Sequence, residues 1–515
     1  MAGLQAVLKL RRWKNSRLPI NRLPPEILVM VATYMEHHEM LVGLTHVCTQ
    51  WRRIITTCPT LWTDVRFDRG DVSLASLCFE RAKGCAVDVR YSFRALRRRR
   101  SPAKEPILPT VFPGNRIRSL FINRAWSTFQ ELVERWGDAL STLQVLEIDA
   151  GNSSIISLPT VLVGGALKDL KLVGGAIPGL YIIKAPNLTS LRLNEIYETP
   201  CSVTVILEFL EDSPALEEVS ICANSISVDD FPPSNKTITL PRARRILLSI
   251  DHAPRIASHI FCPSSKDIRL VNLFPDNPTL IFPPTLRQLL GQYSVEIIDR
   301  VAMCVSGTNK DKACSLRLST PLGTTFQISC ETTFDPDTFD AFPPNTGRWA
   351  FSALFDQAIS ALSQLPLGNV TTFSIDIKGS PPDSVAGSTE VTTKLATVLR
   401  KCQKLDEVTL EHYPRCLPVL LRDDAPSIRI LIIKHSEDDL WEELVEHVAE
   451  VARVRHSRGV PLKRIRIITP TEEESRIKQL ESWVQEVEYR VESPQKSGSR
   501  LWRFPRRRLI PDEIG

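Results

Sequence analysis

The segments ALKDLKL (residues 166–172) and NLTSLRL (187–193) share one pattern, with leucine at the second, fifth and seventh positions. In an extended strand, side chains alternate between the two faces, so the fifth and seventh residues point to one side and the sixth to the other. Each segment therefore predicts a strand with one apolar face. Such a face has to be covered by another part of the chain.

Related copies occur on both sides of these two segments. The clear ones are RIRSLFI (116–122), TLQVLEI (142–148), ALEEVSI (215–221) and ARRILLS (243–249), and weaker ones lie around residues 268, 408, 431 and 465. The first apolar positions of the six clear copies are 117, 143, 167, 188, 216 and 243, which lie at intervals of 21 to 28 residues. This period is typical of a leucine-rich repeat, in which stacking buries the apolar face of every unit. An unrelated α/β domain with repeated strand–helix units is the alternative.

The repeat is irregular, because the period is lost between about residues 271 and 370. There CSLRLSTPLGTTFQISC (314–330) alternates apolar and polar residues on both sides of a Pro-Leu-Gly turn, which predicts a β-hairpin. Further on, EEESRIKQLESWVQ (472–485) predicts a helix and VEYRV (487–491) a strand. The expected fold class is α/β: a short helical module followed by an irregular leucine-rich-repeat-like solenoid over residues 107–492.

The N-terminal part of the chain is apolar beyond what one helix face requires. In LPPEILVMVATYM (23–35), Ile27, Leu28 and Val31 fall on one helical stripe, whereas Met30 is apolar and lies off it. Two further helical runs, 39–48 and 47–58, repeat the same spacing. Three short helices bury little surface by themselves. The surplus apolar surface is therefore expected to pack either on the rest of the chain or on another protein.

The segments LPPEIL (23–28), Met40-Leu41, Leu44 and VCTQWRRII (47–55), followed by PTLW (59–62), resemble the fungal-type F-box motif. The resemblance covers residues 18–66 and departs from the motif at His37-His38-Glu39, where many F-boxes have an aspartate. It implies a three-helix domain that interleaves with a Skp-type adaptor and, through it, joins a cullin-RING ubiquitin ligase.

The resemblance also implies which residues hold this domain together or meet the adaptor. They are Leu23, Pro24, Ile27, Leu28, Val31, Leu41, Leu44, Val47 and Trp51. Among them we expect Leu23 and Pro24 at the interface and Trp51 in the core.

Three other segments are expected to lie outside these two domains. Residues 1–17 are interpreted as a basic N-terminal tail, 67–106 as a connecting segment with a basic linker, and 493–515 as a basic C-terminal tail. The linker contains Arg97 to Arg100, which indicate either a solvated segment or a nuclear import signal. Because no aromatic residues interleave with these arginines, nucleic-acid binding is not expected.

The residue between the last two apolar positions of each copy points away from the core. These residues are Phe121, Glu147, Lys171, Arg192, Ser220, Leu247, Arg269, Thr409, Ile432 and Arg466. Four of the ten are basic and one is acidic. We therefore expect Lys171, Arg192, Arg269 and Arg466 to bind an acidic or phosphorylated segment of a target protein, since arginine binds carboxylate and phosphate in a bidentate manner. Ordinary solvated strand positions are the alternative.

The composition, with 43% hydrophobic and 24% charged residues and a net charge of +5, is that of a soluble globular protein. No apolar run suggests a signal peptide or a membrane span, so a membrane partner is not expected. The 12 cysteines contain no C-x-x-C pair, which favours an intracellular protein of the cytoplasm or the nucleus.

Motifs for chemistry are missing from the sequence. There is no P-loop, no G-x-S-x-G and no H-E-x-x-H. The pairs His259–Cys262 and His412–Cys416 have spacings suited to a metal, but neither has a second pair nearby. We therefore expect no catalytic site, no metal and no cofactor.

These observations together predict a non-catalytic substrate receptor of an SCF-type (Skp adaptor–cullin–F-box) ubiquitin ligase. The F-box would bind the adaptor and the repeats would bind a target protein that the sequence does not identify. One alternative is an F-box and repeat scaffold that acts outside a ligase. The other, an enzyme on a solenoid body, has no support from any motif.

Overall fold

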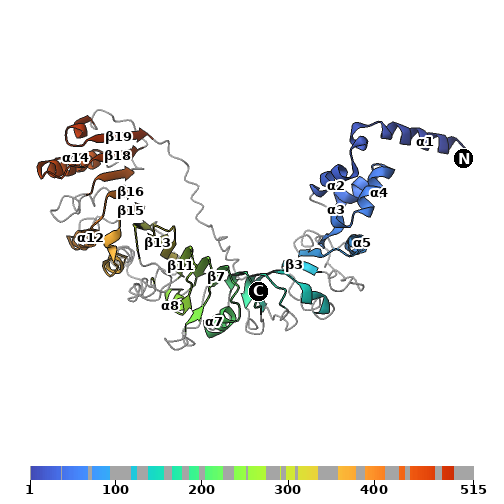
Figure 1. Cartoon of the computed structure of the whole chain (residues 1–515), viewed down its shortest axis with the longest axis horizontal. Coiled ribbons are helices and arrows are strands. Elements are labelled where there is room, and N and C mark those ends of the chain that lie inside the picture. The colour runs from blue at the N-terminus through green and yellow to red at the C-terminus, as the bar shows by residue number, and fades with distance from the viewer. Residues whose placement is uncertain are drawn as a thin grey trace, which may run out of the picture. The chain divides into compact units, whose positions relative to one another are not determined.

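The computed structural model describes residues 2–35, 38–67, 72–92, 117–123, 137–155, 165–176, 185–196, 203–223, 237–250, 253–273, 290, 297–307, 311–333, 358–378, 389–411, 428–434, 441–469 and 478–491. The chain divides into two compact units. Unit 1 comprises Met1–Leu273 with Gly291–Ser294, and unit 2 comprises Phe274–Leu290 with Val295–Gly515. Each unit is mixed α/β with a mostly parallel sheet (Figure 1).

Unit 1 begins with a group of short helices and continues as alternating strands and helices. Its helices are α1 (Ala2–Ser16), η1 (Pro19–Arg22), α2 (Pro25–Thr33), α3 (His38–Thr45), α4 (Thr49–Thr57), η2 (Pro59–Trp62), α5 (Val72–Ala82), η4 (Gly137–Thr142), α7 (Val203–Glu211) and α8 (Ala253–Ala257). Its strands are β1 (Asp64–Arg66), β2 (Val87–Ser92), β3 (Ile117–Asn123), β4 (Val145–Ile155), β5 (Asp169–Ala176), β6 (Ser190–Ile196), β7 (Glu218–Ala223), β8 (Ile238–Thr239), β9 (Arg245–Ser249), β10 (Ile260–Phe261) and β11 (Asp267–Leu273).

The main sheet of unit 1 is a ladder of parallel strands. Within the described residues its order is β1–β2–β3–β4–β5–β6–β7–β9–β11, so strands that follow one another in the chain lie side by side. The short strands β8 and β10 pair separately, also in parallel. Helices α7 and α8 lie on the same side of the ladder (Figure 1).

One hydrogen-bond arrangement recurs where these strands begin. The carbonyl oxygen of Gln144 accepts the N–H groups of Lys168 and Asp169 at 2.8 and 3.0 Å, and the carbonyl of Lys168 accepts those of Thr189 and Ser190 at the same distances. The carbonyls of Thr189, Glu217 and Arg244 repeat the arrangement. Each strand is therefore held in the same register against the strand before it.

The core of the ladder consists of two apolar rows that run across the strands. The first row is Leu120, Leu146, Leu170, Leu191, Val219, Ile246 and Ile268, and the second is Ile122, Ile148, Leu172, Leu193, Ile221, Leu248 and Leu270. Every one of these side chains is at most 2% exposed. The alternation read from L-x-x-L-x-L is therefore confirmed for these strands.

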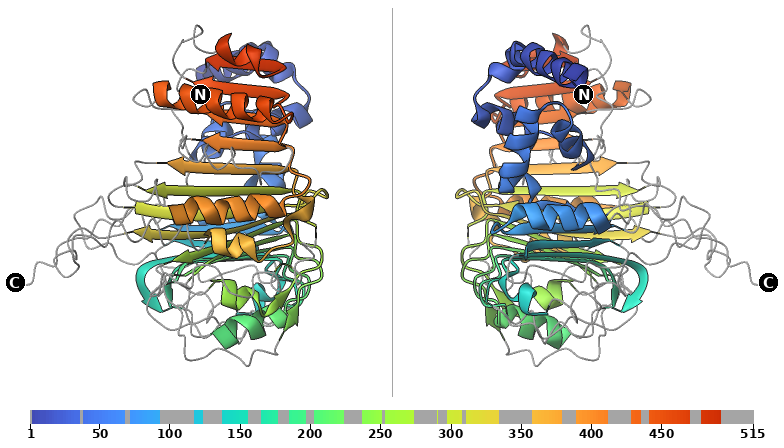
Figure 2. Two further views of the ribbon diagram at one scale, coloured as in Figure 1. Left: turned by 90° about the vertical axis from the view of Figure 1, so that its left-hand side faces the viewer. Right: turned by 90° about the vertical axis from the view of Figure 1, so that its right-hand side faces the viewer.

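The strands of unit 2 begin with antiparallel pairs and continue in parallel. Its strands are β12 (Arg300–Gly307), β13 (Asp311–Ser319), β14 (Thr325–Thr333), β15 (Thr372–Lys378), β16 (Glu407–Glu411), β17 (Ile430–Lys434), β18 (Arg464–Thr469) and β19 (Glu486–Val491), and its helices are η10 (Leu367–Asn369), α12 (Thr389–Lys401), α14 (Trp441–Ser457) and η13 (Lys478–Ser482). β12, β13 and β14 pair antiparallel, whereas β12, β15, β16, β17, β18 and β19 pair parallel. α12 and α14 lie on one face of these strands (Figure 2).

The strand-entry arrangement of unit 1 also occurs in unit 2. The carbonyl of Thr371 accepts the N–H groups of Asp406 and Glu407 at 2.9 and 3.0 Å. The carbonyl of Arg429 accepts the N–H groups of Lys463 and Arg464 in the same way, at the start of β18. The two units therefore share a local building principle.

Two expectations for unit 2 are confirmed and a third is changed. The hairpin is formed by β13 and β14, with Gly323 at a φ of +82° in its turn, and VEYRV lies in β19. The helix expected over 472–485 is, in its described part, only the 3-10 helix η13. Residues 472–477 lie outside the described part of the chain, as do 493–515.

Two segments of unit 1 contain elements that the sequence analysis did not name. The expected basic N-terminal tail, 1–17, contains α1, a segment of good helix formers. The expected connecting segment, 67–106, contains α5 and the ladder strand β2. In β2 the alternating residues Val87, Val89 and Tyr91 are at most 2% exposed, as a strand with one buried face requires. The expected basic linker, 94–106, lies outside the described residues.

The alternation in β6 makes a testable prediction. Leu191→Ala removes a fully buried side chain and should lower the free energy of unfolding by about 2–5 kcal/mol. Its neighbour Arg192 is about half exposed, so Arg192→Ala should cost less than about 1 kcal/mol. Hydrogen exchange of the β5, β6 and β7 amides measures both effects locally. Equal protection in the two variants would contradict the assignment of the buried face.

Candidate protein-interaction sites

The first candidate site is the helical module of α2, α3 and α4. Helix α4 packs against both α2 and α3. Leu28 of α2 and Ile55 of α4 are completely buried, and Trp51 is 3% exposed. The three helices therefore enclose a small core of their own, as the sequence predicts.

Buried polar atoms fix the orientation of this core. Trp51 donates its indole N–H to Oδ1 of Asn21 at 2.9 Å, and Asn21 donates its amide Nδ2 to the carbonyl of Asn15 at 2.8 Å. At the other end of the module, Trp62 donates its indole N–H to the carbonyl of Ile55 at 2.8 Å. Because a buried donor without a partner is costly, these bonds select one packing of the helices.

The surface of the module carries an uncovered apolar stripe. Ile27, Met30 and Tyr34 follow one another at intervals of three and four residues, so they lie on one side of α2, and Leu23 precedes them by one more turn. Their exposed fractions are 37% for Leu23 and Ile27, 51% for Met30 and 80% for Tyr34. Large contiguous apolar surface of this kind marks interaction sites. We call these four residues the α2 stripe.

The structure sorts the nine residues that the sequence implied. Leu28, Leu41 and Trp51 are buried in the module, so they hold the helices together and do not face a partner. Val31 and Leu44 are half-buried, whereas Leu23, Pro24, Ile27 and Val47 are exposed.

The sequence interpretation did not include three exposed residues, Met30, Tyr34 and Met40, among the contact residues. The signal for Met30 was its apolar character off the helical stripe. Two-sided apolar character therefore indicates a helix with one buried apolar side and one exposed apolar side.

The geometry of this module agrees with a comparison to known families. Residues 20–68 match the family model described as F-box-like. The N-terminal module is an F-box-like domain. A search of the curated proteins found no match to the chain.

The F-box-like domain continues directly into the ladder. Its last part contains β1, which pairs in parallel with β2 so that Asp64 lies beside Asp88 and Arg66 beside Arg90. Arg81 of α5 stacks over the ring of Trp62, with its guanidinium carbon 4.4 Å from the ring centre. The F-box-like domain is thus joined to the sheet by strand pairing as well as by the chain.

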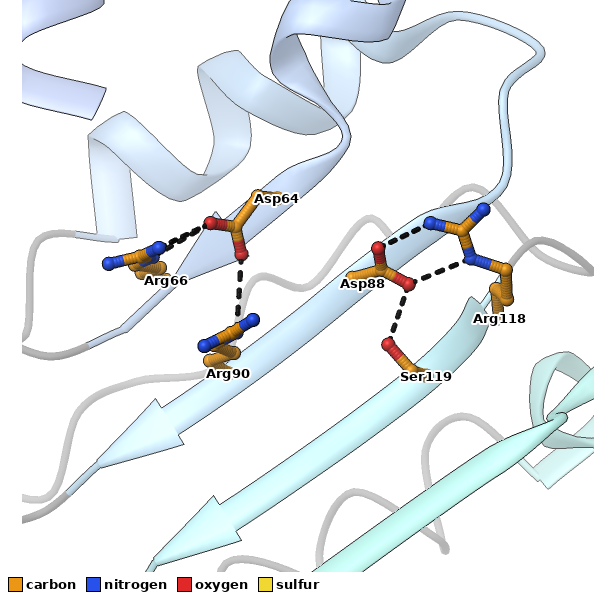
Figure 3. Close-up of polar contacts among 6 residues, drawn as sticks. All are labelled: Asp64, Arg66, Asp88, Arg90, Arg118 and Ser119. Carbon is orange, nitrogen blue, oxygen red and sulfur yellow. Dashed lines mark hydrogen bonds and ion pairs between the residues drawn. The ribbon is translucent and has the colours of Figure 1, made fainter. Parts of the chain in front are cut away.

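Ion pairs reinforce this junction (Figure 3). Asp64 binds Arg66 at 2.7 Å and Arg90 at 3.5 Å. Asp88 on the next strand accepts hydrogen bonds from the guanidinium of Arg118 at 2.5 and 3.0 Å and from the hydroxyl of Ser119 at 2.6 Å. Burial opposes ionisation of Asp88, but the hydrogen bonds from Arg118 and Ser119 outweigh it, so the pKa of Asp88 lies below its ordinary value.

The second candidate site is the exposed face of the ladder in unit 1. Two charged rows cross this face, two residues apart along each strand. The acidic row contains Asp64, Asp88, Asp169, Glu218 and Asp267, and the basic row contains Arg66, Arg90, Lys171, Arg192 and Arg269. One residue of opposite charge stands in each row, Arg245 in the acidic row and Glu147 in the basic row. Three uncharged residues also interrupt each row, Ser119, Val145 and Ser190 in the acidic row and Phe121, Ser220 and Leu247 in the basic row. The two rows therefore carry equal numbers of charges of each sign.

All four cations that the sequence analysis selected for target binding are paired. Lys171 binds Glu147 at 2.5 Å, Arg192 binds Glu218 at 3.3 Å and Arg269 binds Asp267 at 3.0 Å. In unit 2, Arg466 binds Glu488 at 2.7 Å. The first three share the basic row of unit 1. Carboxylates therefore balance the expected excess of positive charge. Three of them, Glu218, Asp267 and Glu488, lie at strand positions outside the ten residues counted from the sequence.

The other candidates for chemistry gain no structural support. His259 and Cys262 are buried, and burial raises the pKa of the Cys262 thiol to about 12. Within the described residues no three His, Cys, Asp or Glu side chains gather closely enough to hold a metal. His412 and Cys416 lie outside the described residues, as do Arg97 to Arg100. None of the helices in the described ranges combines the length and apolar character needed to cross a bilayer.

The junction at Asp88 predicts a pH dependence. A depressed pKa stabilises the fold above the ordinary aspartate pKa, and this contribution disappears as the pH falls through the lower folded value. Asp88→Asn should therefore cost up to about 1 kcal/mol near neutral pH, since the pair is partly exposed. The difference from wild type should shrink in acid.

Urea unfolding at a series of pH values measures this difference. Asp169→Asn is the matched control, because it removes another carboxylate of the acidic row and has no ion pair among the described residues. A cost for Asp88→Asn that grows in acid would show that the pKa is shifted the other way.

Proposed function

We propose that this chain is the substrate-recognition subunit of an SCF-type ubiquitin ligase. The F-box-like domain would bind a Skp-type adaptor, and through it a cullin-RING ligase. The α2 stripe carries this proposal, because Ile27 and Met30 on α2, with Leu23 before the helix and Tyr34 at its end, are exposed apolar residues that suit a helix-in-groove interface. Met40 and Val47, which are about half exposed at the two ends of the α3 segment, extend the available apolar surface.

The ladder of unit 1 and the parallel strands of unit 2 are proposed as a leucine-rich-repeat-like body that holds the target protein. Two features support this assignment. Leucine, isoleucine and valine occupy equivalent rows on successive parallel strands, and one carbonyl accepts two N–H groups at most of the strand entries in the described residues. Both features follow from stacking of one small unit upon the next.

The proposed mechanism is geometric, and catalysis belongs to the partners. Because β1 is both the end of the F-box-like domain and the first strand of the ladder, the adaptor-binding surface and the exposed face of unit 1 belong to one packed structure. A target held on that face would be presented to the ligase at a high effective concentration. The protein would act inside the cell, in the cytoplasm or the nucleus, without a cofactor.

The charged rows refine the chemistry proposed for the target. A uniformly acidic segment would be attracted by the basic row and repelled by the acidic row, which lies only two residues away along the strands. A segment with its own acidic and basic sides would complement both rows. We therefore propose a target surface of mixed charge, since complementary patterns give specificity more than affinity.

The α2 stripe predicts a separation of binding from folding. Ile27→Asp places an unpaired carboxylate in the proposed interface and should weaken adaptor binding by about 100-fold or more. Circular dichroism should stay that of wild type, because Ile27 is exposed. Leu28→Asp instead buries the carboxylate in the core of the module and should unfold it.

Binding of the purified full chain to a Skp-type adaptor, followed by calorimetry, measures the effect of Ile27→Asp. Leu322→Asp is the matched control, because Leu322 is 95% exposed in the hairpin turn of unit 2. Unchanged adaptor binding by a folded Ile27→Asp variant would refute the proposed interface. Recovery of a cullin together with the adaptor separates a ligase subunit from a scaffold that acts outside a ligase.

The charged rows predict the result of a charge exchange. The double variant Glu147→Lys with Lys171→Glu keeps the ion pair, so its free energy of unfolding should lie within about 1 kcal/mol of the wild-type value. It moves each charge by one strand, so it should still reduce target capture as strongly as Lys171→Glu alone. Affinity purification with quantitative mass spectrometry makes the comparison. Full capture by the double variant would show that the pair serves stability alone.

A further inference from the structure

Helix α1 (Ala2–Ser16) has an apolar side that the F-box-like domain does not cover. Val7, Leu10 and Trp13 are 47%, 64% and 54% exposed. They follow one another every third residue, so they fall within an arc of about 120° of the helix circumference. Lys9 and Lys14 are also exposed. At about 100° per residue, Lys9 lies about 40° beyond Trp13, and Lys14 lies within the arc, next to Val7 in projection and one turn past Leu10.

The charge of the same segment has one sign only. Helix α1 contains four basic residues and no acidic residue, and the first acidic residue of the chain is Glu26. At the end of the helix, the guanidinium of Arg17 lies 4.0 Å from the ring centre of Trp13. An exposed tryptophan next to a cation is the combination favoured at the boundary between lipid and water.

Helix α1 is also attached to the F-box-like domain at one end. The carbonyl of Asn15 accepts the Nδ2 hydrogen bond of Asn21, and Asn21 in turn binds Trp51 in the core of the module. Whatever surface α1 contacts is therefore held close to the adaptor-binding helices.

We propose that α1 binds an anionic lipid surface from one side, as a peripheral amphipathic helix. Val7, Leu10 and Trp13 enter the headgroup boundary, and the basic residues contact lipid phosphates and carboxylates. One short apolar side binds a membrane weakly, so both signals are needed, the apolar contact and the charge. A groove in another protein also accepts an amphipathic helix. The lipid surface is favoured because the segment offers cations without any acidic residue to match a groove of mixed charge.

Flotation of the purified full chain with vesicles tests the proposal. Vesicles of phosphatidylcholine with phosphatidylserine should bind the chain about tenfold or more tightly than vesicles of phosphatidylcholine alone, and added salt should remove the difference. The double variant Leu10→Gln with Trp13→Gln should lose binding to both kinds of vesicle. Lys9→Gln with Lys14→Gln should keep the weak binding and lose part of the preference for the anionic vesicles.

Leu322→Gln is the matched control, because it removes an exposed leucine of unit 2 and should bind vesicles as wild type does. No binding to anionic vesicles would overturn the proposal, and so would equal binding to both kinds or wild-type binding by the Leu10 and Trp13 variant. If α1 instead binds a groove in another protein, the chain should show no binding to anionic vesicles. The proposal is independent of the ligase function, because Ile27 lies in α2 and the proposed lipid contacts lie in α1, so Ile27→Asp should leave vesicle binding intact.

Discussion

Parallel pairing in constant register is the constraint on which unit 1 depends. At the entries of β5, β6, β7, β9 and β11, one backbone carbonyl accepts two consecutive N–H groups at the start of the next strand, as Lys168 does for Thr189 and Ser190. Equivalent residues of all strands are thereby placed side by side, and each row has one environment from end to end. A row of leucine and isoleucine becomes a continuous core, although no single strand has enough apolar surface to form one. Charged residues at equivalent strand positions are gathered into rows by the same means, although uncharged residues interrupt these rows.

The first strand of this register belongs to the F-box-like domain. Pairing of β1 with β2, the stacking of Arg81 on Trp62 and the ion pair of Asp64 with Arg90 all join the F-box-like domain to residues 67–106, which were interpreted from the sequence as a connecting segment. Surface ion pairs contribute little stability one at a time. The strand pairing and the burial of Trp62 therefore provide most of the stability of the junction, and the ion pairs fix its register. A target on the exposed face of unit 1 would then be held at a defined position relative to the adaptor.

Local signals made much of this structure predictable. The alternation in NLTSLRL predicts which face of β6 is buried without information on the neighbouring strands. The motif residues from Leu23 to Trp62 likewise predict the helical module. Relations between neighbouring strands were not predictable. Arg192 binds Glu218 only because β6 and β7 pair in one register, and Glu218 lies at a strand position that the count of outward residues left out, so that count gave an apparent basic excess. The strand β2 was missed for a related reason, since VDVRYS precedes an arginine-rich stretch that dominated the interpretation of that segment.

Helix α2 shows why periodicity alone could not separate the core from the binding surface. Leu28 and Ile27 are adjacent in sequence and equally apolar, but α4 and η2 cover only the side of α2 that carries Leu28. The uncovered side has Glu26 as its nearest charge and no basic residue between 25 and 45, whereas α1 combines exposed apolar residues with cations alone. The two surfaces are therefore suited to different partners, a protein groove for α2 and an anionic lipid surface for α1. Asn21 lies between them and binds both Asn15 and Trp51, so occupation of one surface does not require displacement of the other.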